Sequence, residues 1–412
     1  MKNITGWQTQ KLEDIIEINP RSEKLDDDTE VTFLGMADVS NEGRILIRNT
    51  KVYSEVSKGF TSFKENDVLL AKITPCFENG KRALATNLTN GYGYGSTEFH
   101  VLRGNYRLIP EYIYQYVSMY DFMTRGEANM TGSAGQKRVP TDFVKSYEIP
   151  VPPLPEQKKI ANILSAVDGH IDEVDSMIQD LKELKKGLMQ KLLTEGIGHT
   201  EFKDSEVGRI PEDWDVKLLG EVIKLQGGYA FKSKKFQDVG INVLRISNVK
   251  EGYLDISDCA KYPLELLANL DSFKLEAHDS VIAMSGATTG KVGYVRDHDL
   301  PIYLNQRVGR FVVKTSDIDR LYLYYSLNTE YFQTRIWDFA IGGAQPNISG
   351  SQIESIEIQV PSIEEQKSIA YILGNVDERI SLYECEMNDL NDLKKGLMQQ
   401  LLTGKTRVKI DN

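Results

Sequence analysis

One segment of this sequence occurs twice. "LKKGLMQKLLT" at 184–194 recurs as "LKKGLMQQLLT" at 393–403, and "VPPLPEQKKIANIL" at 151–164 aligns with "VPSIEEQKSIAYIL" at 360–373, each at an offset of 209 residues. Self-similarity at a fixed offset indicates that one structural unit is present in two copies. The 412 residues are also too many for one ordinary core, so we expect an even number of domains.

The matched blocks carry the pattern of long amphipathic helices. Their apolar residues are spaced alternately four and three apart, which is the 3.5-residue period of a coiled coil. The predicted seam consists of Ile160, Leu164, Val167, Ile171, Val174, Ile178 and Leu181 in the first copy and of Ile369, Leu373, Val376, Ile380, Tyr383, Met387 and Leu390 in the second. Proline and acidic residues near the start, with lysine and glycine at the end, delimit helices of about 40 residues. Two narrow seams predict that the helices pair with each other; the alternative is that each packs on its own domain.

The block upstream of each helix predicts a mixed α/β fold. Runs rich in β-branched and aromatic residues, such as "VTFLGMADV" and "VGRFVVK", predict strands, and turn clusters such as "FENGK" separate them. Short helices are expected at 110–124 and 321–339, where Tyr and Phe are more typical of a core than of a stacking platform. The polar, glycine-containing segment 195–216 is expected to be an extended linker.

Charge and cysteine usage exclude several classes. The formal net charge of −11 argues against a protein that coats nucleic acid non-specifically, although it is compatible with a local basic face. The three cysteines are widely separated and form no CxxC pair, which disfavours a zinc site and suits a reducing compartment. The sequence has no signal-peptide pattern and no apolar window long enough for a membrane span, so we expect a cytoplasmic location.

The sequence carries no complete enzyme motif. A Walker A loop needs GxxxxGK[ST], but in "SGATTGKVG" at 285–293 the glycines are one residue too close and Val292 replaces the Ser or Thr. The methyltransferase motif Asn-Pro-Pro-aromatic and the nucleophile elbow GxSxG are absent from the sequence. A DNA methyltransferase or nuclease with a diverged site is therefore a minor alternative.

Polar and basic residues gather instead at a few turns. Arg, Lys, Asn and Gln side chains hydrogen-bond base edges, and Ser, Thr and Lys side chains bind phosphates. The candidate DNA-binding residues are Lys72, Thr74, Asn79, Lys81, Arg82, Ser133, Gln136, Lys137 and Arg138 in the first half, and Ser285, Thr288, Thr289, Lys291, Asn305, Gln306, Arg307, Gln345 and Asn347 in the second. No catalytic residue and no metal ligand is expected.

These features together resemble the specificity (S) subunit of type I restriction-modification systems. The resemblance rests on "PLPEQKKIANILSAVDGHID" with "LKKGLMQKLLTEG", on "FKDSEVGRIPEDWDVKLLGEV", and on "EEQKSIAYILGNVDERI" with "LKKGLMQQLLTG". It implies two α+β target-recognition domains separated by two long helices that form an antiparallel coiled coil, with a pseudo-twofold internal repeat. The implied boundaries are 1–150 for target-recognition domain 1, 151–197 for the first spacer helix, 198–358 for the linker and target-recognition domain 2, and 359–412 for the second spacer helix and the tail.

The resemblance also implies a function in defence against foreign DNA. A subunit of this kind has no catalytic activity; each domain reads one half of a bipartite double-stranded DNA site, while the helices set the spacer and dock two methyltransferase subunits. Two restriction subunits complete the complex. No cofactor is expected on this chain, because the partner subunits use S-adenosylmethionine and ATP with Mg²⁺. The alternative is a coiled-coil adaptor or scaffold without DNA specificity.

Overall fold

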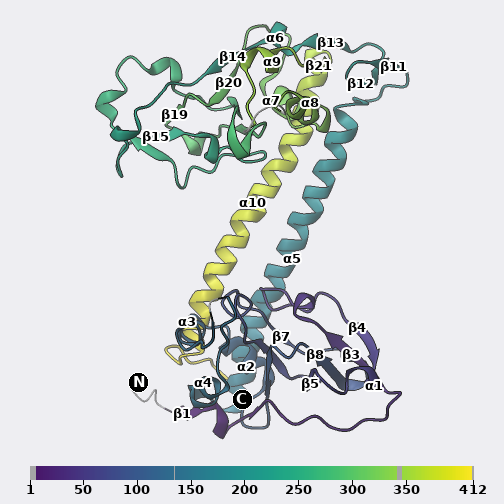
Figure 1. Cartoon of the computed structure of the whole chain (residues 1–412), viewed down its shortest axis with the longest axis vertical. Helices are drawn as coiled ribbons and strands as arrows, with labels where there is room; N and C mark the ends of the chain where they lie inside the picture. The colour runs from purple at the N-terminus through teal and green to yellow at the C-terminus, as the bar shows by residue number, and fades with distance from the viewer. Residues whose placement is uncertain (1–5, 134, 341–345, 411–412) are drawn as a thin grey trace. The chain divides into compact units, whose positions relative to one another are not determined.

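The computed structural model describes residues 6–133, 135–340 and 346–410, which form two compact units (Figure 1). One unit contains residues 1–175 and 385–412, and the other contains residues 176–384. Each unit therefore combines the α/β block of one half with the first part of one long helix and the last part of the other.

The first half contains short strands and short helices followed by one long helix. Its strands are β1 (Gln8–Lys11), β2 (Glu17–Ile18), β3 (Glu30–Leu34), β4 (Asn49–Val52), β5 (Thr61–Lys64), β6 (Val68–Ala71), β7 (Arg82–Leu84), β8 (Tyr92–Gly95), β9 (Phe99–Arg103) and β10 (Glu148–Val151). Its helices are α1 (Tyr53–Val56), α2 (Pro110–Tyr116), α3 (Tyr120–Ala128), α4 (Thr141–Ser146) and α5 (Leu154–Leu192).

The second half repeats this plan. Its strands are β11 (Phe202–Ser205), β12 (Gly208–Pro211), β13 (Asp215–Leu218), β14 (Ile223–Gly227), β15 (Ile241–Leu244), β16 (Ala260–Tyr262), β17 (Ser280–Ala283), β18 (Val292–Tyr294), β19 (Ile302–Leu304), β20 (Val308–Val313) and β21 (Glu357–Val360). Its helices are α6 (Leu219–Val222), α7 (Arg320–Ser326), α8 (Glu330–Ala340), α9 (Gly350–Glu354) and α10 (Ile363–Leu401).

The two halves share most of their sheet topology. The antiparallel sheet β2-β9-β6-β7 of the first half corresponds to β14-β20-β17-β18 in the second. A further sheet joins β4-β3-β8-β5 in the first half and β16-β15-β19 in the second, and β3 is parallel to β8 as β15 is to β19. Each half also has a two-stranded ladder, β1-β10 or β13-β21, whose second strand leads into the long helix. The predicted mixed α/β fold with an internal repeat is confirmed.

The linker prediction was wrong in its conformation. Strands β11 and β12 form an antiparallel hairpin within the segment expected to be extended. Ile210 and Trp214 are buried in the core of the second unit, and their burial ties the hairpin to that unit. The segment is therefore folded structure rather than a flexible connector.

The long helices run antiparallel where they pair. Helices α5 and α10 comprise 39 residues each. The polar contacts between them include Asp168–Lys394 (2.5 Å) and His170–Glu386 (3.2 Å) in the first unit, and Lys182–Glu384 (3.0 Å) and Lys185–Asp377 (2.7 Å) in the second. In each unit, a residue further along α5 pairs with a residue earlier along α10. The two helices are therefore antiparallel where they pair.

None of the predicted seam residues is exposed. The buried ones are Ile160, Leu164, Val174, Ile178, Ile369, Leu373, Val376 and Ile380, and the partly buried ones are Val167, Ile171, Leu181, Tyr383, Met387 and Leu390. A 3.5-residue period places all of these positions along one covered stripe of each helix.

The ends of the long helices complete the domain cores. Ile160 at the start of α5 and Met398 near the end of α10 belong to one core of the first unit. Ile369 at the start of α10 and Leu192 at the end of α5 belong to one core of the second. Part of each predicted seam is therefore domain core, so the two packing alternatives for the helices are combined.

Candidate nucleic-acid interface

Three loops of the second half meet at one end of its antiparallel sheet. The turn after β17 lies beside the segment before α9, because Ser285 and Asn347 form a β-bridge. The same turn lies beside the connection from β19 to β20, because the Met284 amide donates a hydrogen bond to the Arg307 carbonyl (3.0 Å). Three segments that were predicted separately therefore form one cluster of loops.

The first half builds an equivalent cluster. Ile73 after β6 forms a β-bridge with Arg138, and the Thr74 amide donates to the Lys137 carbonyl (2.9 Å). The two predicted loops of this half thus lie side by side. An offset of 209 residues relates Arg138 to Asn347, so these residues occupy corresponding places in the two halves.

A third loop of the first-half cluster was missed by the sequence reasoning. The Lys72 amide donates to the carbonyl of Glu98, which lies between β8 and β9 (2.9 Å). The signal that could have identified this loop is the same offset, which relates Glu98 to Arg307. The sequence did not predict this loop as DNA-binding because it carries the Glu98 carboxylate where the second half carries the Arg307 guanidinium.

The candidates differ in accessibility. Those that are exposed are Asn79, Ser133, Gln136, Lys137, Arg138, Gln306, Arg307 and Asn347, and those that are partly exposed are Lys72, Thr74, Lys81, Thr288, Lys291 and Asn305. Gln345 lies outside the described residues. The remaining candidates, Arg82, Ser285 and Thr289, are buried.

Arg82 is not placed to bind DNA. Its side chain is only 6% exposed, donates to the Gly80 carbonyl (3.0 Å) and stacks on the Tyr114 ring with 5.0 Å to the centroid. A guanidinium with these partners stabilises the protein interior through a hydrogen bond and a cation–π contact. Including Arg82 among the candidates was therefore wrong.

Two further candidates have structural partners. The hydroxyl of Thr289, which is 2% exposed, donates to the Gly286 carbonyl (2.7 Å) and to the Pro346 carbonyl (3.2 Å). The Thr288 hydroxyl donates to the Ile246 carbonyl (2.8 Å). Both hydroxyls hold the turn in shape, and Thr289 is too deeply buried to reach a phosphate.

The two clusters carry different charges at corresponding places. In the first half Arg138 binds Glu98 bidentately, with its Nε and Nη2 each 2.9 Å from a carboxylate oxygen. These hydrogen bonds lower the pKa of Glu98. In the second half Arg307 and Asn347 replace this pair, so the local charge changes from balanced to positive.

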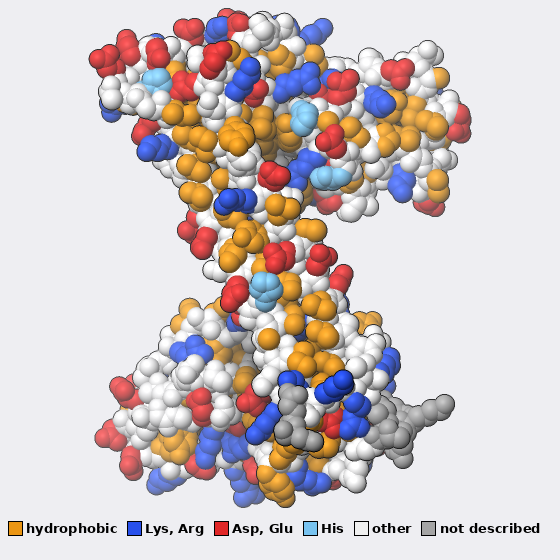
Figure 2. All heavy atoms as spheres, turned by 180° about the vertical axis from the view of Figure 1, so that it is seen from behind, with side chains coloured by type: hydrophobic (Ala, Val, Ile, Leu, Met, Phe, Trp, Pro, Cys, Tyr) orange, Lys and Arg blue, Asp and Glu red, His pale blue; other side chains and the backbone are white. Residues whose placement is uncertain are grey.

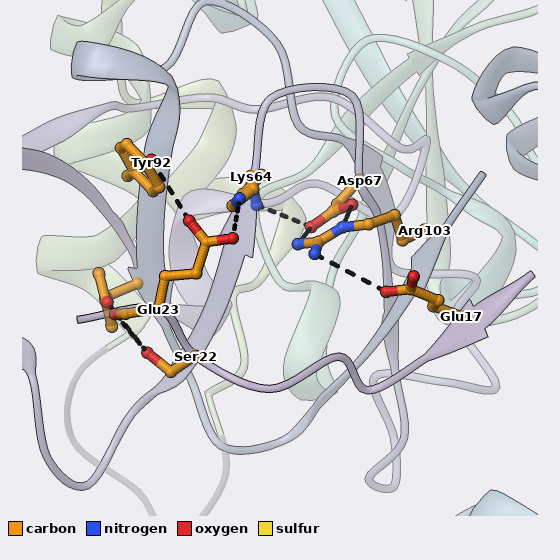
Figure 3. A network of polar contacts seen from close by, with 8 residues as sticks. Glu17, Ser22, Glu23, Lys64, Asp67, Tyr92 and Arg103 are labelled. Carbon is orange, nitrogen blue, oxygen red and sulfur yellow. Dashed lines mark hydrogen bonds and ion pairs between the residues drawn. The ribbon is translucent and has the colours of Figure 1, made fainter. Parts of the chain in front are cut away.

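The scaffolds beneath the loops nevertheless match. Arg103 forms a hydrogen-bonded ion pair with the buried Asp67 (2.7 Å), as Figure 3 shows. Arg310 forms the corresponding ion pair with the buried Asp279 (3.0 Å). In the first half the ion pair joins β9 to the turn before β6. In the second half it joins β20 to the turn before β17. The difference between the halves therefore lies in the loops rather than in the sheets that carry them.

The described residues contain neither a metal-site cluster nor a membrane-spanning helix. In the described ranges 6–133, 135–340 and 346–410, no three His, Cys, Asp or Glu side chains come together as a metal site would require. Within the same ranges, every helix is too short or too polar to cross a membrane.

The family model for the type I restriction modification DNA specificity domain matches the chain twice, at residues 4–183 and 211–391. The chain belongs to this family, that of the specificity subunits of type I restriction-modification systems, which are non-catalytic components of those systems. The two matched stretches correspond to the two halves of the internal repeat.

Curated relatives support this membership. The chain is 39% identical over 285 residues to the MjaVIII specificity subunit of Methanocaldococcus jannaschii, which covers 68% of this chain and 67% of the relative. It is 29% identical over 466 residues to the EcoAI specificity subunit of Escherichia coli, covering 91% and 77%.

Solved structures share the fold. The S subunit of the type I restriction-modification system of M. genitalium aligns with a TM-score of 0.62 at 17% identity, over 98% of this chain and 97% of that one. A chain from a structure of a type I R-M system, described in terms of its complex assembly and conformational transition, aligns with a TM-score of 0.54 at 18% identity.

Proposed function

We propose that residues 1–150 and 198–358 form two target-recognition domains that each read one half of a bipartite double-stranded DNA site. The observation that carries this proposal is the pair of equivalent loop clusters, each built from three segments on the same sheet scaffold. Equivalent positions with different side chains are what two unlike half-sites require, because bases are distinguished by the donors and acceptors that reach their edges.

The paired helices α5 and α10 set the length of the unread spacer in this proposal. Each helix of 39 residues is about 58 Å long at about 1.5 Å per residue. Two half-sites on one face of a duplex lie about one helical turn apart, or a multiple of it, which a rigid helix pair is able to match.

The nearly identical helix ends favour docking of two identical partners, the methyltransferase subunits. Leu184 and Leu393 occupy equivalent positions and are 50% and 51% exposed, so the domain cores do not explain why both are leucine. Gly187 and Gly396 are also equivalent, and a Cβ at either would meet nothing within 4 Å. A mid-helix glycine costs about 0.5–1 kcal/mol relative to alanine. Close approach of a partner explains why both copies keep one.

Figure 2 shows hydrophobic side chains along exposed parts of the long helices, interspersed with charged ones. A surface of this composition is typical of a protein interface rather than of a solvated helix. In the proposed complex the methyltransferase subunits bind S-adenosylmethionine and methylate adenine, and two restriction subunits use ATP and Mg²⁺. Much of the phosphate contact then comes from the partners, because this chain is acidic overall.

The experiment that tests the proposal is co-expression with the methyltransferase encoded beside this chain, followed by long-read mapping of adenine methylation across a genome. We expect a split motif with a fixed gap. Stable association with the methyltransferase but no methylation motif and no DNA preference would instead support the coiled-coil adaptor.

A further inference from the structure

Arg307 has a place in the second-half cluster that sets it apart from the other basic residues there. Its carbonyl accepts from the Met284 amide (3.0 Å), so the backbone at Arg307 is fixed between two loops. Its side chain is exposed, and the guanidinium forms no hydrogen bond or ion pair with any residue that the structure describes. A fixed backbone with a free guanidinium is suited to contact an external ligand.

The corresponding place in the first half is closed by an internal ion pair. Glu98 stands where Arg307 stands, and Arg138 occupies both oxygens of its carboxylate. Internal hydrogen bonds therefore occupy the Glu98 position of the first half, whereas the Arg307 position of the second half presents five N–H donors that bond none of the described residues.

The segment that leads into a basic turn lies against the loop that carries Arg307. The Gln306 amide donates to the Tyr229 carbonyl (2.9 Å), which places the segment after β14 against the loop that carries Arg307. This segment continues into Lys232, Lys234 and Lys235, which are all exposed and whose side chains form no hydrogen bond, ion pair or ring contact with the described residues. Sequence reasoning had not selected these lysines.

The corresponding segment of the first half has the opposite character. After β2 it carries Glu23, whose carboxylate binds Lys64 and accepts from the Tyr92 hydroxyl (3.4 Å), as Figure 3 shows. Asp26, Asp27 and Asp28 follow in the same segment. A duplex phosphate would be repelled by this segment but attracted by the lysines of the second half.

We propose that Arg307 is a specificity-determining residue of the second domain that reads a guanine in the major groove, and that Lys232, Lys234 and Lys235 bind the phosphates next to it. This inference rests on the proposed DNA-reading function. The planar guanidinium matches the O6 and N7 acceptors of guanine bidentately, which is the commonest specific protein–DNA contact, whereas lysines grip phosphates without reading sequence. The second half-site is therefore held with more charge than the first.

The test uses the full complex of this chain with its methyltransferase and compares genome-wide methylation motifs. Replacement of Arg307→Ala should relax one G·C position in one half-site and reduce discrimination there roughly 5- to 150-fold, while the other half-site stays unchanged. Arg307→Lys, which keeps the charge and loses the fork, should relax the same position. An unchanged motif in both variants would overturn the assignment.

The lysines are tested by salt dependence. Joint replacement of Lys232, Lys234 and Lys235 by alanine should keep the methylation motif. It should make the negative slope of the logarithm of the DNA association constant against the logarithm of the salt concentration shallower by up to about 2.7, which is about 0.9 for each phosphate contact. The control is Lys224→Ala, because Lys224 is an exposed lysine that pairs with Val312 near the far end of β20. A change of about 0.9 in the single-lysine control, or no change in the triple variant, would contradict the proposal.

Failure of the proposed function and failure of the Arg307 assignment give different results. If the unmodified complex yields no split motif, the proposed function fails. If Arg307→Ala loses methylation altogether, binding of that complex is measured at low salt to duplexes that carry each of the four base pairs at every half-site position. Loss of preference at one G·C position supports the inference, and retention of all preferences overturns it.

Discussion

The helix ends and the candidate DNA-binding loops have diverged to very different degrees within one chain. The segments 184–194 and 393–403 differ only at Lys191 and Gln400. The loops at corresponding places exchange Glu98 for Arg307 and Arg138 for Asn347, although the antiparallel sheets that carry them have the same strand order. A surface that meets the same partner twice has reason to stay the same, and a surface that meets two different half-sites has reason to differ.

The core contacts of the helices support this interpretation of the repeated segment. Its last leucines fill the domain cores, but Leu184 and Leu393 remain exposed although the copies agree there. Folding alone therefore accounts for only part of the identity.

The largest expected effect comes from lengthening both helices together. A seven-residue heptad added near the middle of α5, within 165–180, and another at the facing part of α10 would extend the pair by about 10 Å. We expect the methylation motif to keep both half-sites while its spacer grows by about three base pairs, at about 3.4 Å per base pair. Long-read methylation mapping gives the spacer directly, and an unchanged spacer would rule out the helices as the ruler.

The matched control for this variant is the same insertion in α5 alone. Ion pairs Asp168–Lys394 and Lys185–Asp377 lie on either side of an insertion placed after Asp168, so a one-sided insertion there is unable to preserve both. We expect it to destabilise the helix pair and abolish methylation.

The next effect concerns the exposed leucines of the repeated segment. Changing either Leu184→Glu or Leu393→Glu should weaken binding of one methyltransferase roughly 10- to 100-fold, because an apolar anchor is replaced by a charge that must be desolvated. The double variant should bind neither. Native mass spectrometry of the purified complex reports how many methyltransferase subunits remain bound.

The control for the leucines lies on the same helix. Leu382 is 64% exposed on α10, but the residue 209 positions earlier is Glu173, so this leucine has no copy. We expect Leu382→Glu to leave both methyltransferases bound. Equal loss in this variant would mean that general helix hydrophobicity, rather than the repeated segment, holds the partners.

Much of the architecture could be predicted from the sequence, because a 3.5-residue period and a constant offset are local signals. What escaped prediction depends on tertiary contacts. Arg82 has the sequence context of an exposed loop residue, but the Tyr114 ring covers it in the fold. The segment 195–216 lacks strand periodicity, although Trp214 anchors it in the core. The contacts between the loops could not be predicted from the sequence either, because β-bridges such as Ser285–Asn347 join residues that lie far apart in the chain.

A smaller difference between the halves concerns the glutamate at the start of each long helix. Glu365 accepts hydrogen bonds from the Trp214 indole (3.0 Å) and from His199 (2.8 Å). Glu156, its equivalent, is instead bound by Arg407, and the indole N–H of the corresponding Trp7 is buried without a hydrogen-bond partner among the described residues. The equivalent glutamates of the two halves therefore accept hydrogen bonds from different donors.

This difference predicts unequal costs for one conservative change. Trp214→Phe removes a donor from a largely buried carboxylate, which should cost about 1–3 kcal/mol beyond the lost apolar contact. Trp7→Phe removes an N–H that has no hydrogen-bond partner among the described residues, so it should lack this extra cost and even remove the penalty of burying that group. Hydrogen exchange of the amides around each tryptophan measures the local stability. Equal losses at the two sites would show that the indole–carboxylate hydrogen bond contributes nothing, and would leave packing as the common cause.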